Sequence, residues 1–169
     1  MSTPKSVIDN AKKQGAKMVD VKFVDTFGTW QHFSVPMAEL TEEVFAEGFG
    51  FDGSSIRGWK SIEASDMLAM PDPNTFEIVP WRGDDAPAAR IFCDIHHLDG
   101  TPFEGDPRQV LRRHVQTAHE RGFTFYVHPE MEFFLFRSEN DPTPIDHGGY
   151  FDLTPQEVTQ DVRRETIGI

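Results

Sequence analysis

Two glutamates with one residue between them, Glu130 and Glu132, are the pair in this sequence whose spacing most directly suggests chemistry. They lie within residues 127–136, a run that is otherwise mostly apolar and aromatic and is therefore typical of a half-buried β-strand. Alternate side chains of a strand share a face, so the two carboxylates would point the same way, roughly 6.6 Å apart along the chain. Aromatic neighbours would remove much of their hydration, a cost that a cation or basic side chains would relieve.

Two interpretations of this glutamate pair stay open on spacing alone. Carboxylate oxygens are hard ligands that suit Mg²⁺ or Mn²⁺, and two carboxylates could serve two ions or share one. The alternative is a sheet whose polar face carries the two glutamates beside Arg or Lys.

A glycine-rich segment over residues 48–58 is the second candidate for chemistry. It has four glycines in eleven residues and carries Asp52, Ser54 and Ser55, so it is predicted to be a loop with unusual backbone angles. Loops of glycine and serine can cradle phosphate, but this one lacks the Gly-Lys-Ser/Thr ending of a Walker loop. A plain surface turn is the competing interpretation.

The composition narrows the function classes. Among 169 residues, 16 are basic and 28 acidic, and the formal net charge of −12 argues against nucleic acid or an anionic membrane surface as a main partner. Cys93 is the only cysteine, so an internal disulfide is excluded and a reducing cytoplasm is the expected compartment. The sequence has no apolar signal core at its N-terminus and no run that approaches a membrane span.

Hydrophobic periodicity predicts the elements of the first hundred residues. Thr3-Pro4 opens a helix over residues 4–14, alternation favours a β-hairpin over residues 18–35, and Thr41 opens a short helix that Gly48 closes. Further strand segments are expected at residues 67–70, 76–81 and 91–95. A polar connection over residues 82–89 joins the last two of them. Together these pieces predict one half-barrel-like sheet.

The rest of the chain is predicted to begin a second domain. Residues 98–106 have the glycines and proline of a linker, and Asp106-Pro107 opens a helix over residues 107–121 that leads into the glutamate strand. Thr154-Pro155 opens a last helix that should still be running at Ile169. The expected organisation is an N-terminal helix, a sheet domain and the start of a truncated domain, at residues 1–15, 16–99 and 106–169.

Five separated blocks of the sequence, taken together, closely resemble glutamine synthetase of the bacterial, class I type. The blocks are Phe51-Asp52-Gly53-Ser54-Ser55-Ile56, then Gly58-Trp59-Lys60 with Ser65-Asp66-Met67, Met70-Pro71-Asp72, Pro129-Glu130-Met131-Glu132-Phe133-Phe134-Leu135-Phe136, and Gly148-Gly149-Tyr150-Phe151. One departure is Ala69, where the family's signature has a bulky apolar residue.

This resemblance implies a fold and a reaction. The fold would be α+β, with an N-terminal β-grasp domain followed by the truncated start of the catalytic α/β domain. The reaction would be the ATP-dependent ligation of ammonia to L-glutamate through a γ-glutamyl phosphate. Glu130 and Glu132 would each bind one of two Mg²⁺ or Mn²⁺ ions, which neutralise the phosphate and the glutamate carboxylate.

The resemblance also implies an ammonium site and an assembly. Asp52 would help to bind ammonium and take its proton, Ser55 and Tyr150 would line that site, and Trp59 would pack at the edge of the loop. The family lends the Asp52 loop to a neighbouring subunit in a ring homo-oligomer, typically a dodecamer. The ATP and glutamate contacts would lie beyond Ile169, so we expect the 169-residue chain alone to be inactive.

Two alternatives accompany this interpretation. The first is a γ-glutamyl ligase that uses another amine, such as putrescine or methylamine; an intact Asp52 speaks for ammonium. The second is a non-catalytic fragment or pseudoenzyme that acts only by assembling with full-length subunits.

Overall fold

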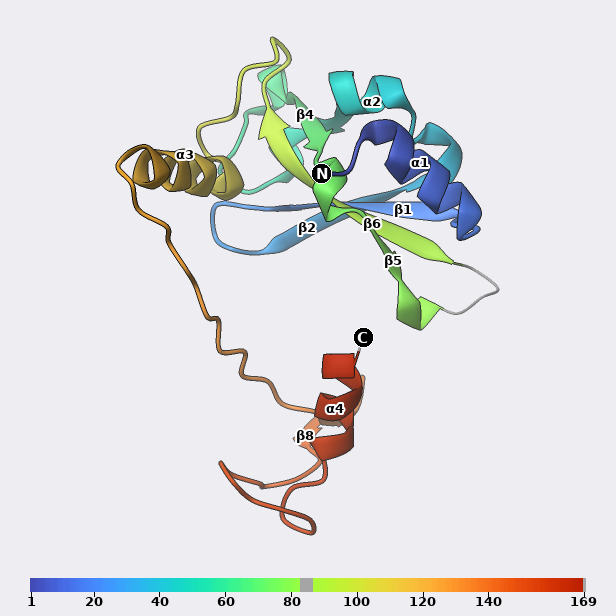
Figure 1. Cartoon of the computed structure of the whole chain (residues 1–169), viewed down its shortest axis with the longest axis vertical. Helices are drawn as coiled ribbons and strands as arrows, with labels where there is room; N and C mark the ends of the chain where they lie inside the picture. The colour runs from blue at the N-terminus through green and yellow to red at the C-terminus, as the bar shows by residue number, and fades with distance from the viewer. Residues whose placement is uncertain (83–86, 169) are drawn as a thin grey trace. The chain divides into compact units, whose positions relative to one another are not determined.

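Strand β6 (Ala88–His96) organises the main sheet, because β1, β4 and β5 all pair with it. The structure, a computed structural model, describes residues 1–82 and 87–168. The chain divides into two compact units, Met1–Phe125 and Tyr126–Ile169. The sheet belongs to the first unit and has the order β2-β1-β6-β4-β3, with β5 paired to β6 off this path (Figure 1).

The pairing divides β6 into two halves. β1 (Met18–Val24) runs parallel to its first half, where β5 (Glu77–Val79) also pairs with it in the antiparallel sense. β4 (Asp66–Pro71) runs antiparallel to its second half. The outer strands are β2 (Trp30–Pro36), antiparallel to β1, and β3 (Phe49–Asp52), antiparallel to β4.

The core lies on one face of this sheet. Alternate residues of β1 and β6 are fully buried, with exposures of 0% at Val19, Val21, Ala89, Ile91 and Ile95. Helices α1 (Pro4–Lys13) and α2 (Glu42–Glu47) pack on this core, α1 through Val7 and Ala11, and α2 through Val44 and Phe45 (Figure 1). This mixed arrangement of helices and sheet confirms the predicted α+β class.

The predicted helix at residues 4–14, the hairpin over residues 18–35 and the helix after Thr41 are all present. The prediction of a continuous loop over residues 48–58 is wrong in its first part, which forms β3. Phe49 and Phe51 alternate with Gly50 and pack into the core, and that alternation outweighs the glycine content. Of the predicted polar connection, residues 83–86 lie outside the described residues.

Helix α3 (Pro107–Glu120) is fixed to β6 by a buried carboxylate. Asp106, 1% exposed, is the N-cap of α3: its Oδ1 accepts from the backbone N–H of Arg108 at 2.9 Å. Its Oδ2 accepts from the backbone N–H of Ile95 at 2.9 Å, so one side chain joins the helix start to the end of the strand. Burial raises the pKa of Asp106 despite these bonds.

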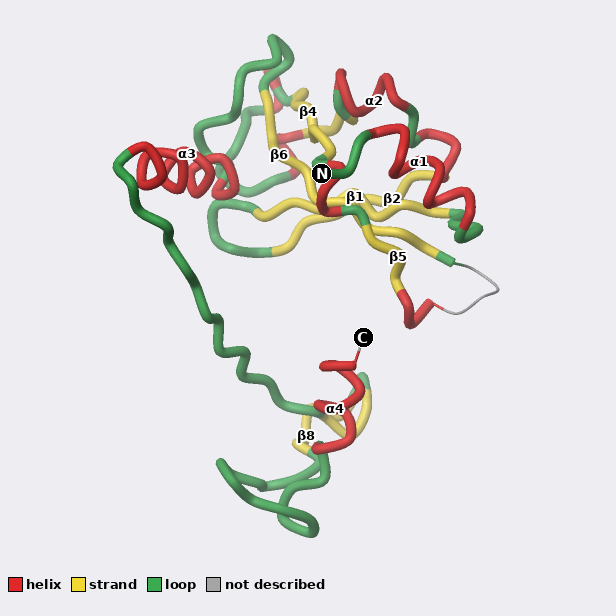
Figure 2. The backbone as a smooth tube through the Cα atoms, in the orientation of Figure 1, coloured by secondary structure: helices red, strands yellow, loops and turns green. Residues whose placement is uncertain are grey.

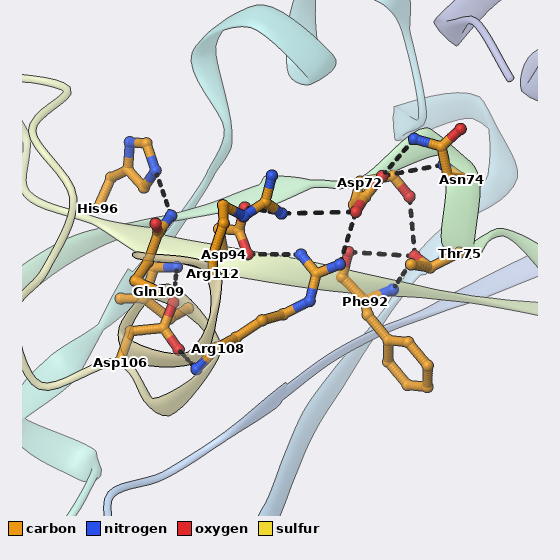
Figure 3. A network of polar contacts seen from close by, with 11 residues as sticks. Asp72, Asn74, Thr75, Phe92, Asp94, His96, Asp106, Arg108, Gln109 and Arg112 are labelled. Carbon is orange, nitrogen blue, oxygen red and sulfur yellow. Dashed lines mark hydrogen bonds and ion pairs between the residues drawn. The ribbon is translucent and has the colours of Figure 1, made fainter. Parts of the chain in front are cut away.

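Four charged side chains extend this attachment (Figure 3). The Arg108 guanidinium contacts Asp94 Oδ1 and Asp72 Oδ2, each at 2.5 Å. Arg112 contacts Asp94 Oδ2 at 2.8 Å and Asp72 Oδ2 at 3.6 Å. The two carboxylates are largely buried, with side-chain exposures of 16% for Asp72 and 13% for Asp94. The cluster is electrically balanced and joins α3 to two segments of the sheet unit.

The second unit has little regular structure (Figure 2). Residues 126–135 are without strand or helix, β7 (Phe136–Ser138) pairs with β8 (Asp141–Pro144), and α4 spans Gln160–Gly168. The predicted helix start at Thr154 is therefore wrong. The Glu157 carboxylate, in a residue 8% exposed, accepts from the backbone N–H of Thr159 at 2.6 Å, so residues before Gln160 form turns. In the described part of the chain, no helix is both long and apolar enough to cross a membrane.

Replacing Arg108 tests the ion cluster. Arg108→Gln leaves two partly buried carboxylates with less compensation, so we expect the free energy of unfolding to fall by about 2 kcal/mol in urea titrations. Arg90→Gln is the matched control, because the Arg90–Glu77 pair is more exposed and should contribute less than about 1 kcal/mol. Equal losses for the two variants would contradict a special role for the cluster.

The same cluster predicts an acid dependence. Burial acts to raise the pKa of Asp72, but the hydrogen bond from Arg108 and those from Asn74 outweigh it and hold that pKa below its ordinary value. A carboxyl with a lowered folded-state pKa stabilises the fold above its unfolded pKa of about 3.9 and loses this as pH falls through the folded value. The stability difference between wild type and Arg108→Gln should therefore shrink below about pH 4. A difference that stays constant to pH 2 would refute this linkage.

Candidate functional site

Asp52 stands at the end of β3, where its carboxylate organises the turn that follows. Its Oδ1 accepts from the Ser54 backbone N–H at 2.8 Å and from the Ser54 hydroxyl at 2.6 Å. Its Oδ2 accepts from the Ser55 hydroxyl at 3.0 Å. The carboxylate thereby caps the short 3₁₀ turn Gly53–Ser55 and remains exposed to solvent.

These hydrogen bonds set the charge of Asp52. The Ser54 hydroxyl, the Ser54 backbone N–H and the Ser55 hydroxyl together hold the pKa of Asp52 below its ordinary value. Asp52 is therefore ionised at neutral pH, and it presents a fixed negative charge to solvent on a short, ordered turn. Such a group can bind a small cation or an ammonium ion by charge and hydrogen bonding.

The Asp52 turn needs glycine at its second position. Gly53 is buried and donates its backbone N–H to the Ser65 carbonyl at 2.7 Å. A Cβ placed on Gly53 would lie 2.4 Å from Met67 Sδ and 2.9 Å from the Ser65 carbonyl oxygen. A side chain would thus push the turn away from β4, which explains why the glycine follows Asp52 directly.

Trp59, which the resemblance places at the edge of the loop, packs into the core and is 8% exposed. Its ring centroid lies 6.3 Å from that of Phe51, the residue immediately before Asp52. Both ends of the Asp52 loop are therefore anchored by aromatic side chains in the same hydrophobic core.

Glu130 and Glu132 are exposed, and the predicted strand around them is absent from the described residues. A strand requires backbone partners and a surface to cover, and in the second unit Tyr126, Met131 and Phe134 are 88%, 85% and 76% exposed. The desolvation expected from aromatic neighbours is thus missing from this conformation. Within the described residues, no group of three or more His, Cys, Asp or Glu side chains has the arrangement of a metal site.

Tyr150, the last predicted site residue, is 90% exposed and its ring packs edge-on against Phe151 at 4.4 Å between centroids. Hydrogen bonds thus join Asp52 to Ser55, whereas Tyr150 and the two glutamates belong to the second unit. The sequence analysis named Ser54 as a hydroxyl of this loop but gave it no role at the site, although its hydroxyl makes the shortest hydrogen bond to Asp52. The signal was present, because an Asp followed two residues later by Ser is typical of a side-chain-capped turn.

Comparison with known proteins identifies relatives of both parts of the chain. The family model described as "Glutamine synthetase, beta-Grasp domain" matches residues 15–98, and "Glutamine synthetase, catalytic domain" matches residues 104–169. The chain is 44% identical to a glutamine synthetase of Methanosarcina mazei over 168 residues, which is 97% of this chain. It spans about 37% of the length of the curated relatives it matches first.

Solved structures also match the fold of this chain. A cryo-EM structure of Plasmodium falciparum glutamine synthetase matches with a TM-score of 0.65 at 24% identity, over 72% of this chain and 23% of that chain. At this identity the likeness shows the fold alone. A structure titled "GmaS/ADP complex-Conformation 1" matches with a TM-score of 0.59 at 26% identity, over 68% of this chain and 26% of that chain.

Removing the Ser54 hydroxyl tests the electrostatics of the turn. Ser54→Ala should raise the pKa of Asp52 toward its ordinary value, because this hydroxyl makes the largest contribution to the lowering. The pKa is measured by titrating the side-chain carboxyl carbons by NMR. Asp99 is an internal control: it accepts from the Thr101 hydroxyl and backbone N–H in the same way, and its pKa should not move. An unchanged Asp52 titration would refute the role of Ser54.

Proposed function

Because the chain belongs to the glutamine synthetase family, we propose that it is the N-terminal portion of an enzyme that ligates ammonia to L-glutamate. ATP would donate its γ-phosphoryl group to the glutamate side chain, and ammonia would displace phosphate from the resulting γ-glutamyl phosphate. The observation that carries the proposal is the Asp52 turn, because it presents an ionised carboxylate on an ordered loop of the matched β-grasp domain.

Asp52 would act first as the counter-charge for ammonium. Its lowered pKa favours binding of a cation but makes the carboxylate a weak proton acceptor while water surrounds it. Exclusion of water by bound substrates would raise that pKa and let Asp52 take the proton that turns ammonium into nucleophilic ammonia. Ser55 and Tyr150 would line this ammonium site.

Glu130 and Glu132 would hold Mg²⁺ or Mn²⁺, one ion each. The donor chemistry fits, because carboxylate oxygens are the ligands these hard cations prefer. The ions would neutralise the transferring phosphoryl group and the substrate carboxylate. Two carboxylates rarely hold Mg²⁺ tightly without further ligands, so we expect strong binding only where the rest of the enzyme and the phosphates contribute.

The proposal extends to organisation and assembly. The domain division would be an N-terminal helix at residues 1–15, a β-grasp domain at 16–99 and the beginning of a catalytic domain at 106–169. The active enzyme would be a cytoplasmic ring homo-oligomer in which the Asp52 loop completes the site of a neighbouring subunit. The 169-residue chain alone would then lack ATP and glutamate contacts and would not turn over.

Glutamine formation by the protein at the length made in its source is the direct test, with the 169-residue chain assayed beside it. We expect activity in the former and none in the latter. Asp52→Asn should raise the KM for ammonium by about tenfold to a hundredfold, because a charge-assisted hydrogen bond is lost. Asp99→Asn, which removes an exposed carboxylate with the same local hydrogen bonding, should leave that KM unchanged.

Several outcomes would overturn parts of this proposal. Preference for putrescine or methylamine over ammonium would replace it with a γ-glutamyl ligase for another amine. Glutamine formation by the 169-residue chain would refute the inactivity of the fragment. A native species of this short length that co-purifies with an intact synthetase and lowers its activity would instead support a non-catalytic assembly role.

A further inference from the structure

The turn between β1 and β2 contacts the Asp52 loop at two separate points. The Thr26 hydroxyl oxygen accepts a hydrogen bond from the indole Nε1–H of Trp59 at 2.9 Å. The next residue, Phe27, lies under the Arg57 guanidinium, whose Cζ is 4.8 Å from the ring centroid. Arg57 and Trp59 follow Asp52 within the same loop, so adjacent residues of one turn hold two positions of another.

The β1–β2 turn is itself held rigidly. Asp25 is 4% exposed, and its Oδ1 accepts from the backbone N–H groups of Phe27 and Thr29, both at 2.9 Å. Its Oδ2 accepts from Gln31 Nε2 at 3.0 Å. Because a buried side chain fixes the backbone on both sides of the turn, Thr26 and Phe27 are presented in defined positions.

The Thr26 hydroxyl acts both as a hydrogen-bond acceptor and as a donor. It accepts from Trp59 and donates its own proton to the Gly105 carbonyl at 3.2 Å. Gly105 precedes Asp106, the N-cap that joins α3 to β6. One hydroxyl therefore connects the hairpin turn, the Asp52 loop and the segment that enters α3.

Trp59 links Thr26 to the loop that carries Asp52 through its packing in the core. Its ring centroid lies 5.5 Å from that of Phe23, 5.2 Å from that of Phe103 and 6.3 Å from that of Phe51. Trp59 is 8% exposed, so without the Thr26 hydroxyl its indole N–H would lose its hydrogen-bond partner at a largely buried position. Loss of the Thr26 hydroxyl would thus loosen the anchor at one end of the loop, while Phe51 continues to hold the other.

We propose that Thr26 and Phe27 are positioning residues for the loop that carries Asp52. They contact neither the carboxylate nor its serines; they act through Trp59 and Arg57, and they set how tightly the loop is held when ammonium binds. The consequence for ammonium rests on the proposed function, whereas the effect on loop mobility does not. The two can therefore be measured separately.

The first measurement is amide hydrogen exchange of the 169-residue chain, followed by mass spectrometry. The reporters are the backbone N–H groups of Gly53, Ile56 and Trp59, which donate within or beside the loop. Thr26→Val keeps the shape and removes the hydroxyl, and should speed exchange over residues 53–59 by about fivefold, the effect of one lost hydrogen bond. Thr26→Ser retains the hydroxyl and should restore slow exchange. Phe27→Leu should give a smaller increase, because it removes only the cation–π contact.

The second measurement is steady-state kinetics of the native-length protein. Thr26→Val should raise the KM for ammonium by about threefold to tenfold and leave the KM for ATP unchanged, and Thr26→Ser should match wild type. Unchanged exchange in Thr26→Val would overturn the positioning role, as would faster exchange with an unchanged ammonium KM. Faster exchange in a protein whose wild type makes no glutamine would uphold the loop contact and refute the proposed function instead.

Discussion

The parallel pairing of β1 with β6 is the constraint on which the rest of the first unit depends. Met18 to Lys22 of β1 pair with Ala88 to Phe92 of β6, so the chain must cross over between two parallel neighbours. The crossover contains β2, α2, β3, β4 and β5. Since β4 pairs with the free half of β6 and β3 with β4, β3 becomes an edge strand. Its end at Asp52 therefore leaves the sheet toward solvent while Phe49 and Phe51 stay in the core, which is the arrangement an exposed but well-placed carboxylate requires.

The carboxylates of the first unit are stabilised in different ways. The formal net charge of the chain is −12, yet the acidic side chains that contact α3 are neutralised by Arg108 and Arg112. Asp106 uses both carboxylate oxygens on backbone N–H groups of different elements. Asp52 has only hydroxyl and backbone donors among its hydrogen-bond partners in the described structure, so its negative charge is stabilised without being cancelled. An ion that binds there meets a full charge.

Sequence patterns correctly predicted the elements whose stabilising contacts lie close together in the sequence. The hairpin over residues 18–35 has alternating apolar residues and a turn that Asp25 closes by itself, so its signal is contained in its own sequence. The strand predicted around Glu130 and Glu132 failed because a strand also needs partners, and periodicity says nothing of their presence. β3 was missed because glycines mask the alternation of Phe49 and Phe51. The role of Thr26 could not be predicted, since its partners Trp59 and Gly105 are distant in the sequence.

Ligation through a γ-glutamyl phosphate can be tested by following the side-chain oxygens of glutamate into the products. The side-chain carboxylate of L-glutamate is labelled with ¹⁸O at both oxygens and supplied with ATP and ammonium to the protein at its native length. Attack of the carboxylate on ATP and then of ammonia on the acyl carbon leaves one labelled oxygen in glutamine and transfers the other to inorganic phosphate. We expect mass spectrometry to find one ¹⁸O atom in each inorganic phosphate that is released. Unlabelled phosphate formed together with glutamine would contradict it.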